Sequence, residues 1–293
     1  MRLGAALGLV LALLGAGCGG VPGTARTTSA TTTKAKPVAP APTGLRVGLV
    51  GPLELDVAGV VARHVTLGST APFVLVSAQA ADPATVAAAA RAHPASHYAL
   101  VGASTKGHRS PNLVGLVLSE NVAATVAGYV AGFAAAEAGA TSPRVAWVGP
   151  MERRLAGAFA RGVHNALPAA AVLDEWSRPV PGLCKEAALL AIDRGAMVVM
   201  AHGGLCAKAA SAAAHEQNLP GLELGNFEFP DVVANLVARD ATEGVYHGGE
   251  DIFFGAASGA IGIGALDPRI SFATLGRARA VVQELASGLR PAR

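Results

Sequence analysis

Short apolar runs alternate with longer amphipathic or small-residue stretches from residue 45 onward. The apolar runs are typical of buried parallel strands, and they predict strands at residues 45–51, 73–77, 97–102, 113–118, 144–149, 170–176, 197–201, 221–224, 232–238, 252–257 and 260–266. The stretches between them predict helices at residues 56–66, 83–93, 119–139, 155–166, 184–195, 205–218 and 271–287.

Repeated strand–helix units of this kind form a parallel sheet with helices on both faces. A break near residues 118–120 divides the units into two groups. The sequence therefore predicts an α/β protein with two Rossmann-like lobes. Ligands of such sheets bind beyond the C-terminal ends of the strands, which in a two-lobed protein border the cleft.

The most apolar predicted helix follows the strand at residues 113–118. Ser119 is a candidate N-cap, and Glu120 places an acid in the first turn, where the helix dipole favours it. Because the helix is apolar nearly all round, we predict that it is buried. A transmembrane span is the alternative, but Ala and Gly contribute little hydrophobicity and the run falls short of about 20 residues.

The N-terminus resembles the leader of an exported lipoprotein. Arg2 precedes an apolar run at residues 3–16, which has the length of a signal-peptide core. Small residues then precede Cys18, as in a bacterial lipobox, where the thiol takes up diacylglycerol. We predict a signal peptide at residues 1–17 and a lipid anchor at Cys18, on the extracytoplasmic side of the cell membrane. An ordinary secretory signal with an incidental cysteine is the alternative.

Residues 18–44 contain no acid, no aromatic residue and few large apolar ones. Such a segment cannot bury enough surface to offset the entropy lost on ordering, so we predict a disordered tether rich in Thr, Pro and Ala. A disordered terminus with no role in anchoring has the same composition.

The net charge of the chain comes from its N-terminal segment. The formal charge is +3, but four positive charges and no acid lie within the first 44 residues. Subtracting those four charges leaves −1 for the rest of the chain. No positive excess is available to neutralise phosphates, so we expect no nucleic-acid partner. Apolar residues make up 52% of the chain, which excludes a disordered body.

Signatures of catalytic and cofactor sites are missing from the sequence. It has no HExxH, GxSxG or Walker A motif, and GAIGIG at residues 259–264 lacks dinucleotide-binding spacing. His202 and Cys206 have the spacing of two metal ligands on one helical face, but two glycines intervene. We expect no catalytic residue, cofactor or metal; an exported α/β enzyme is an alternative that no residue constellation supports.

Two cysteines remain when Cys18 is assigned to lipid. Cys184 and Cys206 begin predicted helices on either side of the strand at residues 197–201, and helix starts in a parallel β–α fold share one edge of the sheet. An exported protein folds in an oxidising compartment, so we predict a disulfide between them. Two free thiols are the alternative.

Four segments from residue 112 onward form an ordered set: NLVGLVLSENVAATVAGYVAGF, RVAWVGPMERRLAGAFARGV, LCKEAALLAIDRGAMVVMAHGG and SGAIGIGALDPRIS. In the same order, they resemble segments of the basic membrane protein family, the PnrA-like substrate-binding lipoproteins of ABC transporters. The order of the four segments carries the resemblance.

The resemblance implies a type I periplasmic-binding-protein fold, with two lobes joined by three strands and a small solute between them, often a purine nucleoside. It implies a first lobe at residues 45–118, a second lobe at 119–239, and a return segment with a closing helix at 240–293. The first lobe is shorter than the family's by about one β–α unit. The implied partner is an ABC permease in the membrane.

The ligand-binding acids of the family are missing here. The family's first loop carries Asp and Asn, whereas GPLELDVAG at residues 51–59 offers only Glu54 and Asp56. Gly102 stands where the family has a ribose-binding Asp. Because each lost charged hydrogen bond costs about 1.5–3 kcal/mol, we expect weak or no binding of purine nucleosides.

Gly203 and Gly204, at the start of a helix, match cleft residues of the family directly. Trp147 either stacks on a ligand ring or fills the core. The candidate ligand-binding residues are Glu54, Asp56, Ser104, Trp147, Met151, Gly203, Gly204, Asn226 and Arg239.

Two functions fit these features. One is a lipid-anchored solute-binding component of an importer, whose lobes close on a small polar molecule. The other is a degenerate surface lipoprotein that acts as a sensor or scaffold without a nucleoside ligand.

Overall fold

The computed structural model describes residues 44–289 of the 293-residue chain. The predicted signal peptide, Cys18 and the tether up to residue 43 lie outside the described residues.

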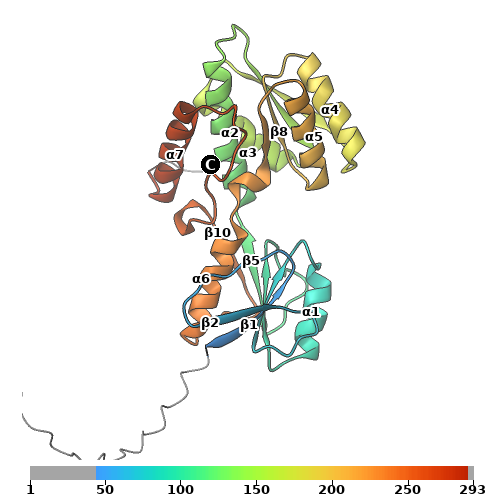
Figure 1. Cartoon of the computed structure of the whole chain (residues 1–293), viewed down its shortest axis with the longest axis vertical. Helices are drawn as coiled ribbons and strands as arrows, with labels where there is room; N and C mark the ends of the chain where they lie inside the picture. The colour runs from blue at the N-terminus through green and yellow to red at the C-terminus, as the bar shows by residue number, and fades with distance from the viewer. Residues whose placement is uncertain (1–43, 290–293) are drawn as a thin grey trace, which may run out of the picture. The chain divides into compact units, whose positions relative to one another are not determined.

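Two parallel sheets form the body of the protein (Figure 1). The first has the strand order β10-β5-β4-β3-β1-β2 and consists of β1 (Leu45–Val50), β2 (Val60–His64), β3 (Phe73–Ser77), β4 (His97–Val101), β5 (Leu113–Leu118) and β10 (Asp251–Phe254). The second has the order β7-β6-β8-β9 and consists of β6 (Arg144–Gly149), β7 (Ala171–Trp176), β8 (Val198–Ala201) and β9 (Gly221–Glu223). The predicted α/β class with two parallel sheets is confirmed.

Residues 44–289 also form seven helices and two short 3-10 turns, η1 and η2. They are α1 (Pro83–Ala92), α2 (Glu120–Glu137), α3 (Arg153–Ala166), α4 (Pro181–Asp193), α5 (Leu205–Glu216), η1 (Leu224–Phe227), α6 (Pro230–Thr242), η2 (Ala256–Ser258) and α7 (Phe272–Ala286). Within the described part of the chain, none of the helices has the length and hydropathy of a membrane span.

Helix α2 is buried along most of its length, as its apolar composition predicts. It packs against α3 and α7, and Figure 1 shows α7 alongside it. Ser119 occupies the N-cap position but makes no side-chain capping bond. Its backbone N–H donates instead to the carbonyl oxygen of Phe254 at 2.8 Å, because the chain passes from one sheet to the other at this point.

The chain passes between the two sheets three times: after Leu118, at residues 227–230, and after Phe254. Backbone contacts join the passing segments to their neighbours. The N–H of Phe229 donates to the carbonyl of Ala260 at 2.8 Å, and Glu228 forms an antiparallel bridge with Ile261. These three passages correspond to the three joining strands that the family resemblance implies.

Residues 56–66, predicted as a helix, form a loop followed by strand β2. The β-branched Val60 and Val61 pair with Leu45 and Arg46 of β1, so the open edge of the sheet decides the conformation of this segment.

Residues 232–238, predicted as a strand, belong to helix α6. The buried residues Val233, Ala234, Val237 and Ala238 lie on one helical face, and Pro230 begins the helix. Helix α6 contacts β1 and β4 of the first sheet, and Figure 1 shows it alongside β1. The boundary predicted at residue 239 therefore lies inside α6.

Residues 260–266 were predicted as a strand, but they do not form one. Within residues 44–289, their one β-contact is the isolated bridge of Ile261 with Glu228. Loops, not helices, join β1 to β2 and β2 to β3. Helix α6 covers the first sheet from a later part of the chain.

Candidate functional site

A cavity of about 660 Å³ lies at the C-terminal ends of strands from both sheets. It is lined by Gln79, Glu120, His202, Gly203, Gly204, Leu205, Ala207, Lys208, Glu223, Leu224, Gly225 and Glu228. We call it the strand-end cavity.

The topology explains why these residues meet. Gln79 follows the end of β3, and Glu120 follows β5 in the first sheet. In the second sheet, His202 directly follows β8, and Glu223 is the last residue of β9. Parallel strands present their carboxyl ends at one edge of a sheet, and ligands of open α/β sheets bind at that edge.

Two glycines shape the loop between β8 and α5. Gly203 and Gly204 both have positive φ, +96° and +59°, which L side chains rarely adopt. No side chain caps the N-terminus of α5, which begins at Leu205 and borders the cavity. The backbone of this loop therefore approaches the cavity directly.

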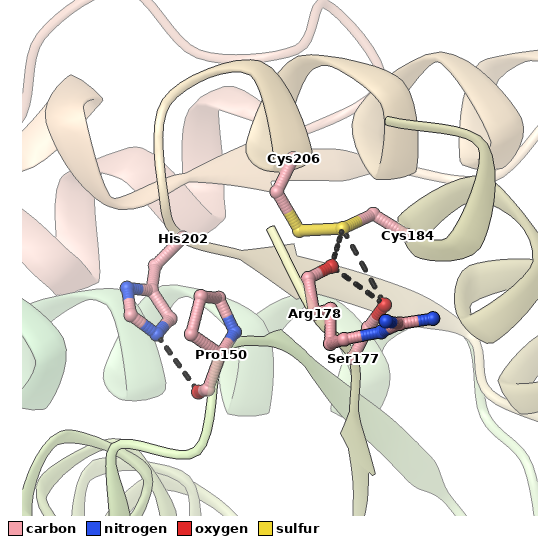
Figure 2. The surroundings of a disulfide bond; sticks show 6 residues. All are labelled: Pro150, Ser177, Arg178, Cys184, His202 and Cys206. Carbon is pink, nitrogen blue, oxygen red and sulfur yellow. Dashed lines mark hydrogen bonds between the residues drawn. A yellow bond between two sulfur atoms is a disulfide. The ribbon is translucent and has the colours of Figure 1, made fainter. Parts of the chain in front are cut away.

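The His202 ring is held on the wall of the cavity. Its Nε2 lies 3.2 Å from the carbonyl oxygen of Pro150 (Figure 2). Its ring centroid lies 5.0 Å from that of the buried Trp147. With one ring nitrogen engaged by a backbone carbonyl and one face against Trp147, the imidazole has a fixed orientation.

A disulfide between Cys184 and Cys206 lies behind the same loop (Figure 2). Both residues are fully buried, and they belong to the first turns of α4 and α5. The Cα atoms are 5.3 Å apart. The bond ties the start of α5, and with it the loop at residues 202–204, to the start of α4.

Carboxylates dominate the charge of the strand-end cavity. Glu120, Glu223 and Glu228 line it, against a single lysine, Lys208. Burial, and secondarily the charge of Glu120, raise the pKa of Glu228 to about 7. The Oε1 atom of Glu228 is buried without a hydrogen-bond partner among the described residues.

Of the nine predicted ligand-binding residues, Gly203 and Gly204 line this cavity. The loop with Glu54 and Asp56 is held instead against α6: their N–H groups donate to Asp231 Oδ1 at 3.0 Å and to Asn235 Oδ1 at 2.9 Å. A different cavity, of about 340 Å³, is lined by Asp56 and Arg239.

The remaining candidates lie elsewhere. Trp147 is fully buried and packs against Phe159, which is the core position and not a stacking platform. The Ser104 hydroxyl donates to Asp251. Met151 is 61% exposed after β6, and the Asn226 side chain donates to the carbonyl of Ala265. None of these four is among the residues that line the strand-end cavity.

Six polar side chains of the lining are not among the predicted ligand-binding residues: Gln79, Glu120, His202, Lys208, Glu223 and Glu228. A signal for some of them was present, because residues that end or directly follow predicted strands meet at this edge. Glu228 had no such signal, since its segment lies between a 3-10 turn and a helix.

Cys206 is in the disulfide, so its sulfur is not a free metal ligand beside His202. Within residues 44–289, no group of three or more His, Cys, Asp and Glu side chains is arranged to hold a metal ion.

Two solute-binding proteins of ABC transporter systems have similar structures. The one from Conexibacter woesei is 16% identical over 85% of this chain and 98% of its own, with a TM-score of 0.56. The one from Aeropyrum pernix is 16% identical over 85% of this chain and 92% of its own, also with a TM-score of 0.56. The chain has a type I periplasmic-binding-protein fold.

The same fold occurs in a transcriptional activator of the comK gene from Bacillus halodurans. It is 12% identical over 84% of this chain and 99% of its own, with a TM-score of 0.61. No protein-family model and no curated protein sequence matches the chain. At these identities the likeness concerns the fold, and the narrower resemblance to the basic membrane protein family stays a prediction.

Proposed function

We propose that this protein is the solute-binding component of an ABC-type importer and binds a small polar molecule in the strand-end cavity. The observation that carries the proposal is that loops from the carboxyl ends of strands in both sheets line one cavity of about 660 Å³. This is the place where open parallel sheets bind ligands, and the volume lies in the range of small-molecule sites. The two ABC transporter proteins of the same fold add support.

The proposal includes a lipid anchor at Cys18 on the extracytoplasmic face of the cell membrane. The lipobox-like sequence and the Thr/Pro/Ala tether support it. The disulfide between Cys184 and Cys206 also fits an oxidising compartment. An anchored binder would remain near its permease, and the protein would hand over the solute without chemical change.

A second candidate function is a surface sensor or scaffold that binds no nucleoside. It is supported by the absence of the family's ligand-binding acids. Gly102, for example, stands where the family has a ribose-binding Asp. Glu54 and Asp56, the two acids predicted in the first loop, are held against α6 by backbone hydrogen bonds.

Thermal unfolding of the purified protein with a panel of solutes tests the proposal. A ligand at 100 times its Kd stabilises the folded state by about 2.7 kcal/mol, so a true solute raises the Tm in a concentration-dependent way. Mass spectrometry of the natively purified protein would identify a co-purified solute. A panel without any Tm shift, together with no co-purified solute, would favour the sensor or scaffold.

Membrane fractionation tests the anchor separately. The wild-type protein should partition into the membrane fraction and carry a lipid mass on Cys18. Cys18→Ala should leave the protein in the soluble extracytoplasmic fraction or retain its signal peptide. If wild type and variant fractionate alike, the anchor is wrong and solute binding is untouched.

A further inference from the structure

We infer that the solute bound in the strand-end cavity carries a positively charged organic amine, which is held between Glu120 and Glu228. The inference rests on the proposed function, because it names the chemical class of the solute for the same cavity. It follows from the position of two carboxylates, from an unsatisfied buried oxygen, and from the charge of the cavity lining.

Glu228 has an unmet hydrogen-bonding need. Its Oε1 atom is buried, and no hydrogen-bond donor among residues 44–289 reaches it. Its backbone is held by an antiparallel bridge to Ile261. A buried carboxylate oxygen without a donor costs free energy, and a ligand that supplies an N–H group there would recover it.

Glu120 lines the same cavity as Glu228 and is a source of like charge for it. It begins α2 directly after the first passage between the sheets, whereas Glu228 lies on the second passage. The two carboxylates repel each other enough that Glu120 contributes to the raised pKa of Glu228. A cation between them would replace this repulsion with two charge-assisted hydrogen bonds.

No protein cation performs this role. Lys208, in the first turn of α5, is the one lysine of the lining, and His202 Nε2 lies against the Pro150 carbonyl. The ion pairs formed between described residues do not include Glu120, Glu223 or Glu228. The cavity therefore keeps an excess of negative charge that its own residues leave unbalanced.

An amine fits this arrangement better than a metal ion. Calcium takes six to eight oxygen ligands that converge on one point. Across the described part of the chain, no three acidic, His or Cys side chains are arranged in that way. An ammonium group needs fewer acceptors, and its three N–H donors can point to separate carboxylates.

The position of the two glutamates couples binding to the passages between the sheets. Each glutamate belongs to a different segment that joins the first sheet to the second. An amine that binds both carboxylates would tie these segments together. Ligand binding would then favour one relative arrangement of the passages, which is how closure of a two-lobed protein is driven.

The test combines solutes of different charge with isosteric variants. The probes are spermidine and L-arginine as cations, ribose and adenosine as neutral solutes, succinate as an anion, and calcium chloride. Spermidine is a pure cation and L-arginine also carries a carboxylate, so the two separate a polyamine from an amino-acid type of ligand. The variants are Glu228→Gln and Glu120→Gln, with Glu243→Gln as the matched control at the exposed end of α6.

We expect at least one organic cation to raise the Tm of the wild-type protein and to bind in calorimetry. Glu228→Gln and Glu120→Gln should each weaken that binding tenfold or more, while Glu243→Gln should leave it unchanged. Circular dichroism of each variant should show a folded protein, so that loss of binding is not loss of structure.

Other results would overturn the inference and leave the proposed function standing. These are tight binding of a neutral or anionic solute that both glutamine variants retain, or stabilisation by calcium alone with no response to the amines. A panel in which no solute of any charge raises the Tm would instead overturn the proposed function, and with it this inference.

Discussion

Gly128 of α2 and Gly162 of α3 lie face to face at the point where the two helices come closest. A Cβ atom on Gly162 would overlap the carbonyl oxygen of Thr125, and one on Gly128 would overlap the carbonyl oxygen of Phe159. The backbones of the two helices are therefore in direct contact. This packing holds α2, which begins beside the strand-end cavity, against α3.

Gly162→Ala should destabilise the protein strongly, because a methyl group has no room between the two backbones. We expect a loss of about 3 kcal/mol or more in the free energy of unfolding, measured by urea denaturation. Gly157→Ala, in the same helix, is the control: its Cβ would have only the tip of Arg161 nearby, at 3.7 Å. It should raise stability by about 0.5–1 kcal/mol. Equal effects of the two substitutions would argue against the close contact.

Removing the disulfide should loosen the wall of the cavity. Cys184 and Cys206 are 22 residues apart in sequence, and a cross-link over a loop of this size stabilises by about 3 kcal/mol in the chain-entropy model. The double substitution Cys184→Ala with Cys206→Ala should lower the free energy of unfolding by about that amount. Reduction with dithiothreitol should have a similar effect on the wild-type protein and none on the variant. An unchanged Tm after full reduction would contradict the prediction.

Glu228 should make stability fall as pH rises. Its pKa is raised from 4.5 to about 7 in the folded protein, so the folded state holds more protons than the unfolded state between these values. Stability then decreases with pH across this window and levels off above it. Glu228→Gln should remove the slope and be more stable at pH 8, by up to about 3 kcal/mol. Glu243→Gln should keep the wild-type profile, measured by denaturation at pH 5 to 8.

Asp267 should act in the opposite direction. Burial alone would raise its pKa, but hydrogen bonds from the backbone N–H groups of Arg269 and Gly221, with the nearby His215, lower it overall. The stability it supplies is present above its unfolded pKa of about 3.9 and is lost as pH falls through the lower folded value.

Asp267→Asn should therefore cost about 2–3 kcal/mol at pH 7, since it removes the charge from a carboxylate that Gly221 N–H reaches at 3.0 Å and Arg269 N–H at 2.9 Å. It should also flatten the acid limb of the stability profile. Asp193→Asn, exposed at the end of α4, should change stability by less than about 0.5 kcal/mol. If the free energy of unfolding of Asp267→Asn still falls steeply at acid pH, another group causes that decrease.

Purine nucleosides should bind weakly or not at all. Gly102 stands where the resemblance to the basic membrane protein family would place a ribose-binding acid, and the carboxylates that line the cavity come from other positions, such as Glu120 and Glu228. Titration calorimetry with adenosine and guanosine should give no submicromolar affinity. A submicromolar Kd for either would show that this cavity recognises ribose without the family's acids.

The sequence by itself determined the helices and strands whose local residue pattern indicates burial or a helix start. The apolar run at residues 113–118 coincides with β5, and Pro83 begins α1 behind the capping side chain of Asp82. These signals are local, because a fully buried strand is apolar throughout and a helix start needs a cap and tolerates proline. The α/β class follows from the repetition of such units.

Only the tertiary structure decided the segments whose periodicity fits two conformations. VVANLVA at residues 232–238 has the residue types of a strand, but it is a helix because its apolar face covers the first sheet. Residues 60–64 became a strand because β1 had a free edge.

The cavity was decided in the same way. Gly203 and Gly204 were predicted from the family resemblance. Glu120 and Glu228, in contrast, are 108 positions apart, and they line one cavity only because the chain passes twice between the sheets. Hydrophobic periodicity records whether a residue is buried, and it carries no information about which distant residue lies opposite. The negative charge of the cavity therefore depends on which segments the tertiary structure brings together. The fold class, in contrast, follows from the hydrophobic pattern along the chain.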